Sequence, residues 1–379
     1  MMTRREYLKQ GTLASCSLAL IGVRELRAQA DVHFDADIDG RGSLKVHAHK
    51  RGLLAGCAGT ADDLKEDAFR KMLVQQYSIM VAANALKFGP LKPKPESYFF
   101  DDADALVAFA QEHKMQFRGH NFVWHEALPP WFAGTVTKEN AKRILTDHIL
   151  TVGGRYKGKV HSWDVVNEAI NVSDGRPDGL RKSPWFELIG PEYLEIAYRT
   201  ARQADPMAKL TYNEYGIENE SEKADKKRAA TLALLKRLKA AGAPVDALGI
   251  QSHIPAGTDA TYGRGLREVI DAAQGMGLEV YLTELDVTDD DVQDAEVAVR
   301  DRAVAEAYHA YLNCALESRA VKAALTWGLT DAHTWLNGIK SHREKQPNRP
   351  ERPLPFDAEY KPTEAFFAMR SAFDKATHR

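Results

Sequence analysis

Short apolar stretches rich in Val, Ile, Leu and Ala alternate along the chain with longer segments whose apolar residues recur every three or four positions. The short stretches are typical of buried strands, and the longer segments are typical of helices that bury one face. The pattern predicts strands at residues 52–57, 78–84, 116–120, 160–166, 209–213, 247–251, 278–284 and 323–327. It predicts helices at residues 44–50, 102–113, 138–152, 191–204, 222–241, 264–275 and 294–317.

Strands that alternate with helices in this way indicate the α/β class, in the form of a closed (β/α)8 TIM barrel. A chain of 379 residues is long enough for one such barrel with extended loops. The alternative is an open doubly wound sheet, which usually carries a glycine-rich turn after its first strand. Gly56 and Gly59 resemble that turn only weakly. Because no repeat or linker marks a second module, residues 31–379 are predicted to form a single domain.

Residues 1–30 are expected to be a twin-arginine export signal rather than part of the fold. Arg4 and Arg5 precede a short apolar region at residues 13–23, and a typical cleavage site ends at Ala30. The protein is therefore expected to be periplasmic or secreted. The residues before Cys16 also resemble a lipid-attachment sequence, which leaves a lipid anchor at Cys16 as an alternative.

The charge of the chain is nearly balanced, with 51 Lys and Arg against 53 Asp and Glu and a net charge of -2. No block of one sign stands out, which argues against nucleic acid or a membrane surface as a partner. The apolar region of the signal is too short to span a bilayer. Cys57 falls in a predicted strand and Cys314 in a predicted helix. Two buried free thiols are therefore expected, with a disulfide between them as the alternative.

A glutamate stands at or just after the carboxyl end of two predicted strands. Asn167 and Glu168 follow the strand at 160–166, and Glu284 ends the strand at 278–284. The carboxyl ends of all strands in a barrel lie on one face, where β/α barrels carry their active sites. Two carboxylates that face each other there are the equipment for cleaving a glycosidic bond. A separation of roughly 5–5.5 Å indicates a retaining mechanism, and roughly 6.5–9.5 Å an inverting one.

Aromatic and polar residues lie at or after the carboxyl ends of other predicted strands. They are His120 and Trp124, Gln251 and His253, and Trp327 and Trp335. Sugar hydroxyls need hydrogen-bond partners, and the apolar faces of pyranose rings pack on aromatic side chains. A zinc site at His120 and His125 is the alternative, but no cysteine cluster or further zinc motif accompanies them, so no metal or cofactor is expected. Taken singly, each of these residues is also compatible with a structural role in the core.

Five motifs occur in a fixed order along the chain. They are His120-x-x-x-Trp124-His125, Trp163-Asp164-Val165-Val166-Asn167-Glu168-Ala169, Gly249-Ile250-Gln251-Ser252-His253, Thr283-Glu284-Leu285-Asp286, and Trp327-Gly328 with Trp335. Together they resemble the signature of family 10 glycoside hydrolases, the endo-β-1,4-xylanases. The resemblance covers essentially the whole chain after residue 30. It implies a retaining enzyme that cleaves xylan or xylo-oligosaccharides without a cofactor, and we expect it to act as a monomer.

The resemblance also implies a role for individual residues. Glu168 matches the family's general acid/base and Glu284 its nucleophile, with His253 bonded to the nucleophile and backed by Asp286. Asn167 matches the contact to the 2-hydroxyl of the sugar under attack. The residues that match the lining of the glycone side are His120, Trp124, Gln251, Trp327 and Trp335, with Asn84 and Lys87 one sugar further out.

The chain departs from the family at residues 83–88, where Glu-Asn-Glu-Met-Lys-Trp is replaced by Ala-Asn-Ala-Leu-Lys-Phe. Ala83 takes the place of the glutamate that helps bind the second glycone sugar in the family. Loss of a charge-assisted hydrogen bond costs on the order of 1.5–3 kcal/mol. Trp131 and three arginines of a late loop are candidates to compensate by contacting acidic decorations: Arg343, Arg349 and Arg352.

Two alternative functions remain open. The first is another retaining barrel glycosidase, acting on cellulose or mannan, because such enzymes also carry Asn-Glu on one strand and a glutamate on a later one. The second is a non-catalytic barrel that binds carbohydrate and has lost turnover.

Overall fold

The computed structural model describes residues 38–379 except 258–261, 294–295 and 340–348, and residues Asp39–Arg379 form one unit. Its strands are all parallel and close into a ring, because β6 pairs with both β5 and β8. The ring consists of β1 (Leu54–Gly59), β2 (Ile79–Ala82), β3 (Gln116–Val123), β4 (Ser162–Asn167), β5 (Lys209–Glu214), β6 (Ala247–Ile250), β8 (Glu279–Thr288) and β9 (Val321–Thr326). These correspond to the eight predicted strands, so the predicted TIM barrel is confirmed.

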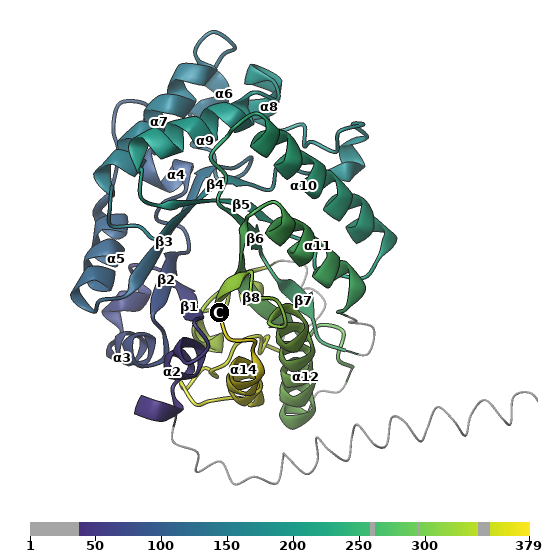
Figure 1. Cartoon of the computed structure of the whole chain (residues 1–379). Coiled ribbons are helices and arrows are strands. Elements are labelled where there is room, and N and C mark those ends of the chain that lie inside the picture. Colours follow the sequence, from purple (N-terminus) through teal and green to yellow (C-terminus); the bar gives the residue numbers. More distant parts are fainter. Residues whose placement is uncertain (1–37, 258–261, 294–295, 340–348) are drawn as a thin grey trace, which may run out of the picture. The chain divides into compact units, whose positions relative to one another are not determined.

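Helices surround the ring of strands, as the view in Figure 1 shows. They include α2 (Leu44–His49), α3 (Asp67–Gln76), α5 (Asp101–Glu112), α7 (Ala141–Arg155), α9 (Tyr193–Ala204), α10 (Glu222–Ala240), α11 (Arg264–Gly275), α12 (Val297–Ala315) and α14 (Glu364–Lys375). Short helices α4 (Phe88–Leu91), α6 (Phe132–Thr135) and α8 (Pro184–Ile189) lie in the loops after β2, β3 and β4. All seven predicted helices are present with small shifts at their ends, whereas α3, α4, α6, α8 and α14 were not predicted.

One strand of the structure has no predicted counterpart. The segment β7 (His253–Pro255) follows β6 after Gln251 and Ser252, and it pairs with the last part of β8. This pairing exists because β8 continues to Thr288, four residues beyond its predicted end at 284. The register places His253 opposite Asp286 at the rim of the barrel.

Small and branched residues fill the inside of the barrel. Ala58, Ile79, Val81, Ala247, Tyr281, Ala323 and Leu325 form one buried cluster that draws on β1, β2, β6, β8 and β9. Arg118 of β3 pairs with Asp164 of β4, and both side chains are 1% exposed. The guanidinium of Arg118 also lies over the ring of Tyr281, with 5.2 Å between Cζ and the ring centroid. An ion pair so deeply buried would be costly without such partners, and it ties β3 to β4 directly beneath the carboxyl ends of the strands.

Gly119 of β3 is required by the packing of Trp163 on the neighbouring strand β4. Trp163 is fully buried and stacks on Phe122 with ring centroids 4.2 Å apart. A Cβ at Gly119 would lie 2.0 Å from Cε3 of Trp163. We expect Gly119→Ala to lower the free energy of unfolding by about 1–3 kcal/mol, because the indole must leave its packed position.

The measurement for this prediction is the midpoint of urea unfolding. Gly154→Ala in α7 is the control, since a Cβ there meets nothing within 4 Å. Alanine in a helix is favoured over glycine by up to about 1 kcal/mol, so the control is expected to be neutral or stabilising. An unchanged midpoint in Gly119→Ala would contradict the proposed contact.

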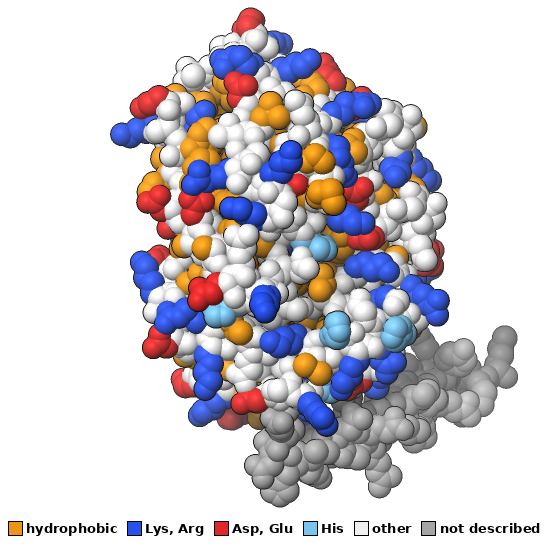
Figure 2. Space-filling view, turned by 60° about the vertical axis from the view of Figure 1, so that its left-hand side comes forward, with side chains coloured by type: hydrophobic (Ala, Val, Ile, Leu, Met, Phe, Trp, Pro, Cys, Tyr) orange, Lys and Arg blue, Asp and Glu red, His pale blue; other side chains and the backbone are white. Residues whose placement is uncertain are grey.

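The charged surface agrees with the balanced composition. Figure 2 shows Lys and Arg side chains interspersed with Asp and Glu over the face that it presents. Within the described ranges, no helix combines the length and apolar character needed to cross a membrane. The predicted export signal at residues 1–30, with Cys16, lies outside the described residues.

Cys57 of β1 and Cys314 of α12 are both buried free thiols, in agreement with the prediction from their sequence context. Burial raises the pKa of the Cys57 thiol well above its ordinary value. The thiol is therefore held in its protonated form, which is unreactive.

Candidate active site

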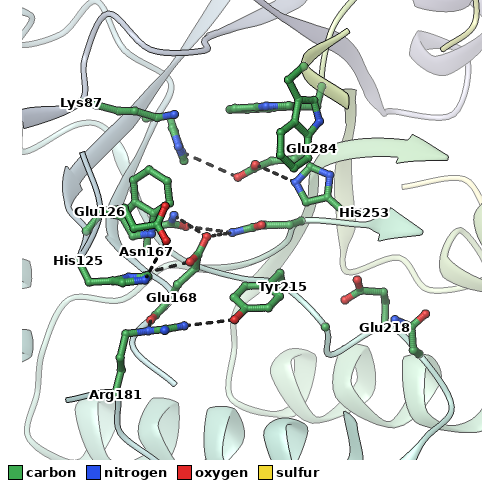
Figure 3. A pocket seen from close by; sticks show the side chains of 17 residues that line it. Lys87, His125, Glu126, Asn167, Glu168, Arg181, Tyr215, Glu218, His253 and Glu284 are labelled. Carbon is green, nitrogen blue, oxygen red and sulfur yellow. Dashed lines mark hydrogen bonds and ion pairs between the residues drawn. The ribbon is translucent and has the colours of Figure 1, made fainter. Parts of the chain in front are cut away.

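A cavity of about 560 Å³ opens where the strands of the barrel end. Figure 3 shows side chains pointing into it from several strands and from the loops that follow them. The predicted site residues that line it are Lys87, His120, Trp124, Asn167, Glu168, Gln251, His253, Glu284, Trp327 and Trp335. Of the remaining predicted residues, Asp286 lies behind His253, and Asn84 lines an adjoining cavity. The structure therefore gathers residues spread over the length of the chain into one place.

Glu284 of β8 is nearly buried and surrounded by groups that stabilise its negative charge. Asn213 Nδ2 donates to Oε1 at 2.6 Å, and His253 Nε2 lies 3.3 Å from Oε2. His120 Nδ1 lies 3.9 Å from Oε1. Burial by itself would raise the pKa of Glu284, but the hydrogen bond from His253 and the nearby charge of His120 outweigh it and lower the pKa to about 2. The carboxylate is thus held ionised, which is the form required of a nucleophile.

His253 connects Glu284 to a second carboxylate. Its Nδ1 lies 2.7 Å from Asp286 Oδ1, and Asp286 Oδ2 accepts a hydrogen bond from Trp335 Nε1 at 2.6 Å. Burial alone would lower the pKa of His253, but Asp286 and Glu284 together raise it well above the ordinary value. A protonated imidazole donates from both nitrogens, so it can bond both carboxylates at once. Asp286 and Trp335 therefore fix the orientation of the ring that contacts Glu284.

Glu168 stands where the chain leaves β4. Its backbone has a left-handed φ of 58°, which is uncommon outside glycine. This conformation is held because Glu168 N donates to the carbonyl of Asn213 at 2.9 Å and Arg181 Nε donates to the carbonyl of Glu168 at 2.7 Å. The side chain, 12% exposed, extends into the cavity. The turn thus places Glu168 on the open side of the cavity, whereas Glu284 is buried.

The Glu168 carboxylate contacts neutral amides and an imidazole. Gln251 Nε2 donates to its Oε1 at 2.9 Å, and Asn167 Nδ2 donates to the same oxygen at 3.2 Å. His125 Nδ1 lies 4.0 Å from Oε2. Burial lowers the pKa of His125 to about 4, so that ring is neutral at ordinary pH. The two carboxylates consequently have different direct partners, since Glu284 is bonded to the imidazole of His253 and Glu168 is bonded to the neutral amides of Gln251 and Asn167.

Asn213 of β5 joins the two glutamates and was not predicted as a site residue. Its Nδ2 donates to Glu284 and, at 3.0 Å, to Asn167 Oδ1, while Asn167 in turn bonds Glu168. Thr283 Oγ1 donates to Asn213 Oδ1 at 2.7 Å and so fixes the amide. The available signal was a polar residue at the carboxyl end of the predicted strand 209–213, the same rule that identified Glu168 and Glu284.

Aromatic and basic residues lie on the Glu284 side of the cavity (Figure 3). His120 is held by Asp164, with 3.0 Å between Nδ1 and Oδ2, and it packs edge-on against Trp327 with ring centroids 5.2 Å apart. Lys87 Nζ lies 5.0 Å from the centroid of the Trp124 ring. These groups offer hydrogen-bond donors between aromatic faces, as a sugar ring requires.

The loop after β4 supports Trp124 from outside the cavity. Helix α8 begins there because Ser183 accepts a hydrogen bond from Phe186 N at 3.2 Å and Pro184 occupies the first helical position. The helix presents the buried Trp185, whose Nε1 donates to the carbonyl of Trp124 at 3.2 Å. This contact fixes the backbone that carries Trp124.

The cavity continues past Glu168 on the side away from Lys87, over residues that were not predicted. Tyr215 follows β5 and is 38% exposed. Arg181 donates to its hydroxyl at 3.3 Å, and Lys227 Nζ lies 3.1 Å from its ring centroid. An exposed aromatic ring fixed by two cations is a suitable platform for a second sugar, so the cavity extends on both sides of the glutamates.

The suggested contacts to acidic decorations are not supported. Trp131 does not line the cavity, since its Nε1 donates to the carbonyl of Lys92 at 2.8 Å and its ring packs against Phe88. Arg352 binds Asp301 and Arg349 donates to the carbonyl of Asp289 at 2.8 Å. Arg343 lies outside the described residues. Trp131 was wrongly chosen because an indole in a loop looks exposed in sequence, whereas here it is needed for packing.

The possibility of a zinc site is not favoured by this geometry. His120 is bonded to Asp164, and His125 lies beside Glu168 and Glu126. Over the part of the chain that the structure describes, no group of three His, Cys, Asp or Glu residues is arranged to hold a metal ion.

The amino-acid sequence of the chain is similar to that of proteins from one known family. The sequence profile of glycosyl hydrolase family 10 matches residues 43–372. Endo-1,4-beta-xylanase B of Thermotoga neapolitana is 33% identical over 341 residues, which are 88% of this chain and 92% of that protein. Endo-1,4-beta-xylanase A of Caldicellulosiruptor sp. (strain Rt8B.4) is 35% identical over 318 residues, 79% of this chain, but the chain spans only 43% of that protein.

A solved structure agrees with the sequence comparison. Xylanase 10B from Thermotoga petrophila RKU-1, in complex with xylobiose, superimposes with a TM-score of 0.77 at 32% identity, covering 88% of this chain and 97% of that one. Because the family profile extends over most of the chain and the barrels superimpose over most of their length, this chain belongs to glycosyl hydrolase family 10.

Proposed function

We propose that the chain is a retaining endo-1,4-β-xylanase, with Glu284 as the nucleophile and Glu168 as the general acid/base. The observation that carries the proposal is the pair of glutamates in one cavity, one held ionised by His253 and His120, the other bonded to the neutral amides of Gln251 and Asn167. The relatives named as xylanases and the xylobiose bound to a related barrel support xylan as the substrate.

In the first step, one carboxylate oxygen of Glu284 attacks the anomeric carbon of the sugar. The bond from that carbon to the glycosidic oxygen breaks, and the leaving oxygen takes the proton of Glu168. The product is a glycosyl ester on Glu284 and a free chain end on the Tyr215 side of the cavity. Asn167 lies beside Glu168 and is positioned to bond the 2-hydroxyl of the sugar under attack.

In the second step, Glu168 is a carboxylate and takes a proton from a water molecule. The water oxygen attacks the anomeric carbon, and the ester bond to Glu284 breaks. Two inversions at the same carbon give retained configuration. Glu284 returns as a carboxylate, which is the form that His253 and Asn213 stabilise.

The acid limb of the pH profile tests the role of His253. The pKa of Glu284 is about 2, so the nucleophile stays ionised over the acid range and does not itself limit the wild-type enzyme there. His253→Asn removes a hydrogen bond and a positive charge, so the pKa of Glu284 rises toward its ordinary value of 4.5. Because activity needs the ionised form, we expect the acid limb of kcat/KM to move to higher pH.

The same shift has a consequence for stability. A carboxylate with a lowered pKa in the folded state contributes stability above its ordinary pKa, and that contribution is lost as the pH falls toward the folded value. In His253→Asn the free energy of unfolding is therefore expected to fall less steeply than in the wild type as the pH is lowered from about 4.5 to about 2.

Two measurements check these effects of His253→Asn. The acid limb is read from normalised rate profiles with an aryl xylobioside, and the stability is read from urea unfolding at each pH. His49→Asn, at an exposed position, is the control. Identical acid limbs in wild type and His253→Asn would contradict the role.

The substrate is tested by digesting linear xylan, glucuronic-acid-decorated xylan, cellulose and mannan side by side and sizing the products over time. Mixed short oligomers released early from xylan support an endo-xylanase. A faster rate on cellulose or mannan would make the chain another barrel glycosidase, an outcome made relevant by a 30% identical relative named Exoglucanase XynX from Acetivibrio thermocellus. Binding without products from any of the glycans would contradict an enzymatic function.

A further inference from the structure

A second cavity, of about 190 Å³, adjoins the catalytic cavity on its Lys87 side. The two cavities share Lys87, Trp327 and Trp335 as walls. The second cavity is otherwise lined by the end of β1, by Phe69 of α3 and by the loops that follow β1, β2 and β9. A sugar chain that passes Glu284 on this side therefore enters the second cavity next.

The wall formed by the loop after β2 has no carboxylate. Ala83 lies there, followed by Asn84, whose Oδ1 accepts a hydrogen bond from Lys87 Nζ at 2.9 Å. Among the described residues that line this cavity, the acidic one is Asp63, from the loop after β1. Asp63 and Ala83 belong to the loops after β1 and β2, neighbouring strands of the barrel.

The carboxylate of Asp63 is held in a fixed position. Its Oδ2 accepts a hydrogen bond from Thr60 N at 2.8 Å, and Asp63 N donates to Thr60 Oγ1 at 3.1 Å. His333, from the loop after β9, lies with Nδ1 3.5 Å from Asp63 Oδ1 and Nε2 3.2 Å from Glu66 Oε1. The edge-on packing of His333 against Phe69, with centroids 6.2 Å apart, holds the imidazole in place.

The Asp63 carboxylate also has capacity to accept further hydrogen bonds. A carboxylate has about four acceptor positions, of which the hydrogen bond from Thr60 N uses one, and His333 lies near the other oxygen. The side chain is 13% exposed, and it lies in the wall of the cavity. Trp335, 44% exposed, supplies an aromatic face in the same cavity. A preorganised acceptor beside an aromatic face is a typical arrangement for binding sugar hydroxyls.

We propose that Asp63, positioned by His333, binds hydroxyl groups of the second glycone sugar and so supplies the carboxylate that is missing at residue 83. This inference rests on the proposed function of the chain as a glycan hydrolase. Asp63 acts on binding of an uncharged sugar two positions from the cleaved bond, and it takes no part in the chemistry at the anomeric carbon.

The test compares an aryl β-xyloside, which fills only the sugar site at Glu284, with an aryl β-xylobioside, which also fills the second cavity. For Asp63→Ala we expect kcat/KM on the xylobioside to fall about 10-fold or more, since a charge-assisted hydrogen bond is lost. On the xyloside we expect no change. Asp62→Ala is the matched control, because Asp62 is a neighbouring carboxylate with a side chain 86% exposed that pairs with Lys65. It should leave both rates unchanged.

A second variant separates sugar binding from loop folding. Adding Ala83→Glu to Asp63→Ala returns a carboxylate to the same cavity from the other loop, so we expect the rate on the xylobioside to recover at least in part. Thermal unfolding of each variant shows whether the loop is intact. Equal losses on both substrates, or an unchanged ratio of the two rates in Asp63→Ala, would overturn the assignment.

The two proposals fail in different ways. If the wild-type enzyme cleaves aryl glucosides and cellobiosides in preference to xylosides and xylobiosides, the proposed substrate is wrong. In that case Asp63→Ala is compared with the wild type on the aryl cellobioside and the aryl glucoside. The ratio of these two rates still decides whether Asp63 binds the second sugar.

Discussion

Replacing Glu284 with alanine is expected to reduce turnover of xylan on the order of 10⁵-fold or more, because the covalent intermediate can no longer form. The loss should appear in kcat rather than in KM, since the walls that bind the sugars stay in place. Removal of this buried charge leaves His253 bonded to Asp286 alone, so the variant is expected to fold. Initial rates on xylan and on an activated aryl xylobioside measure the effect.

Azide distinguishes the nucleophile from a structural carboxylate. In Glu284→Ala the anion fits the space left by the carboxylate and attacks the anomeric carbon from the face opposite the leaving oxygen. A single displacement inverts the carbon, so the product is expected to be the α-glycosyl azide. Glu187→Ala, an exposed position on α8, is the control and should retain full activity. A β-glycosyl azide from Glu284→Ala would mean that the nucleophile has been assigned to the wrong glutamate.

Replacing Glu168 with alanine is expected to lower kcat on xylan by about 10²–10⁴-fold, the usual contribution of a positioned acid or base. The loss should be much smaller for the first step, formation of the glycosyl ester on Glu284, when the substrate is a dinitrophenyl xylobioside. The leaving group of this substrate needs no proton. Deglycosylation still lacks its base, so the glycosyl ester on Glu284 accumulates. A rapid burst followed by a slow steady state is the expected time course.

Azide gives the opposite stereochemical result in this variant. The ester on Glu284 occupies the α face, so azide enters from the β face through the space left by Glu168 and yields the β-glycosyl azide. Gln251→Ala serves as a comparison, because it removes a hydrogen bond to Glu168 but keeps the carboxyl group. It should lower the rate without changing the product. Equal losses of Glu168→Ala on xylan and on the dinitrophenyl substrate would argue against proton donation by Glu168.

The sequence by itself determined the fold class, most of the elements, and both glutamates. Each strand is a local apolar run and each helix a local periodicity, so both were visible without neighbours in space. Residues at the ends of those runs share one face of a barrel by topology alone, which is why Glu168 and Glu284 were found. Helix α14 was missed although it carries the same signal, with Phe366, Met369 and Phe373 buried at helical spacing.

Only the tertiary structure decided which side chains meet and how they are charged. Asn213 joins Glu168 to Glu284 because the registers of β4, β5 and β8 align their ends, and His253 meets Asp286 because β7 adds itself to an extended β8. Asp63 and His333, at opposite ends of the chain, share a wall only because β9 closes the ring against β1. Local patterns specify the elements, whereas contacts between residues far apart in sequence depend on strand register and ring closure, which no single segment encodes.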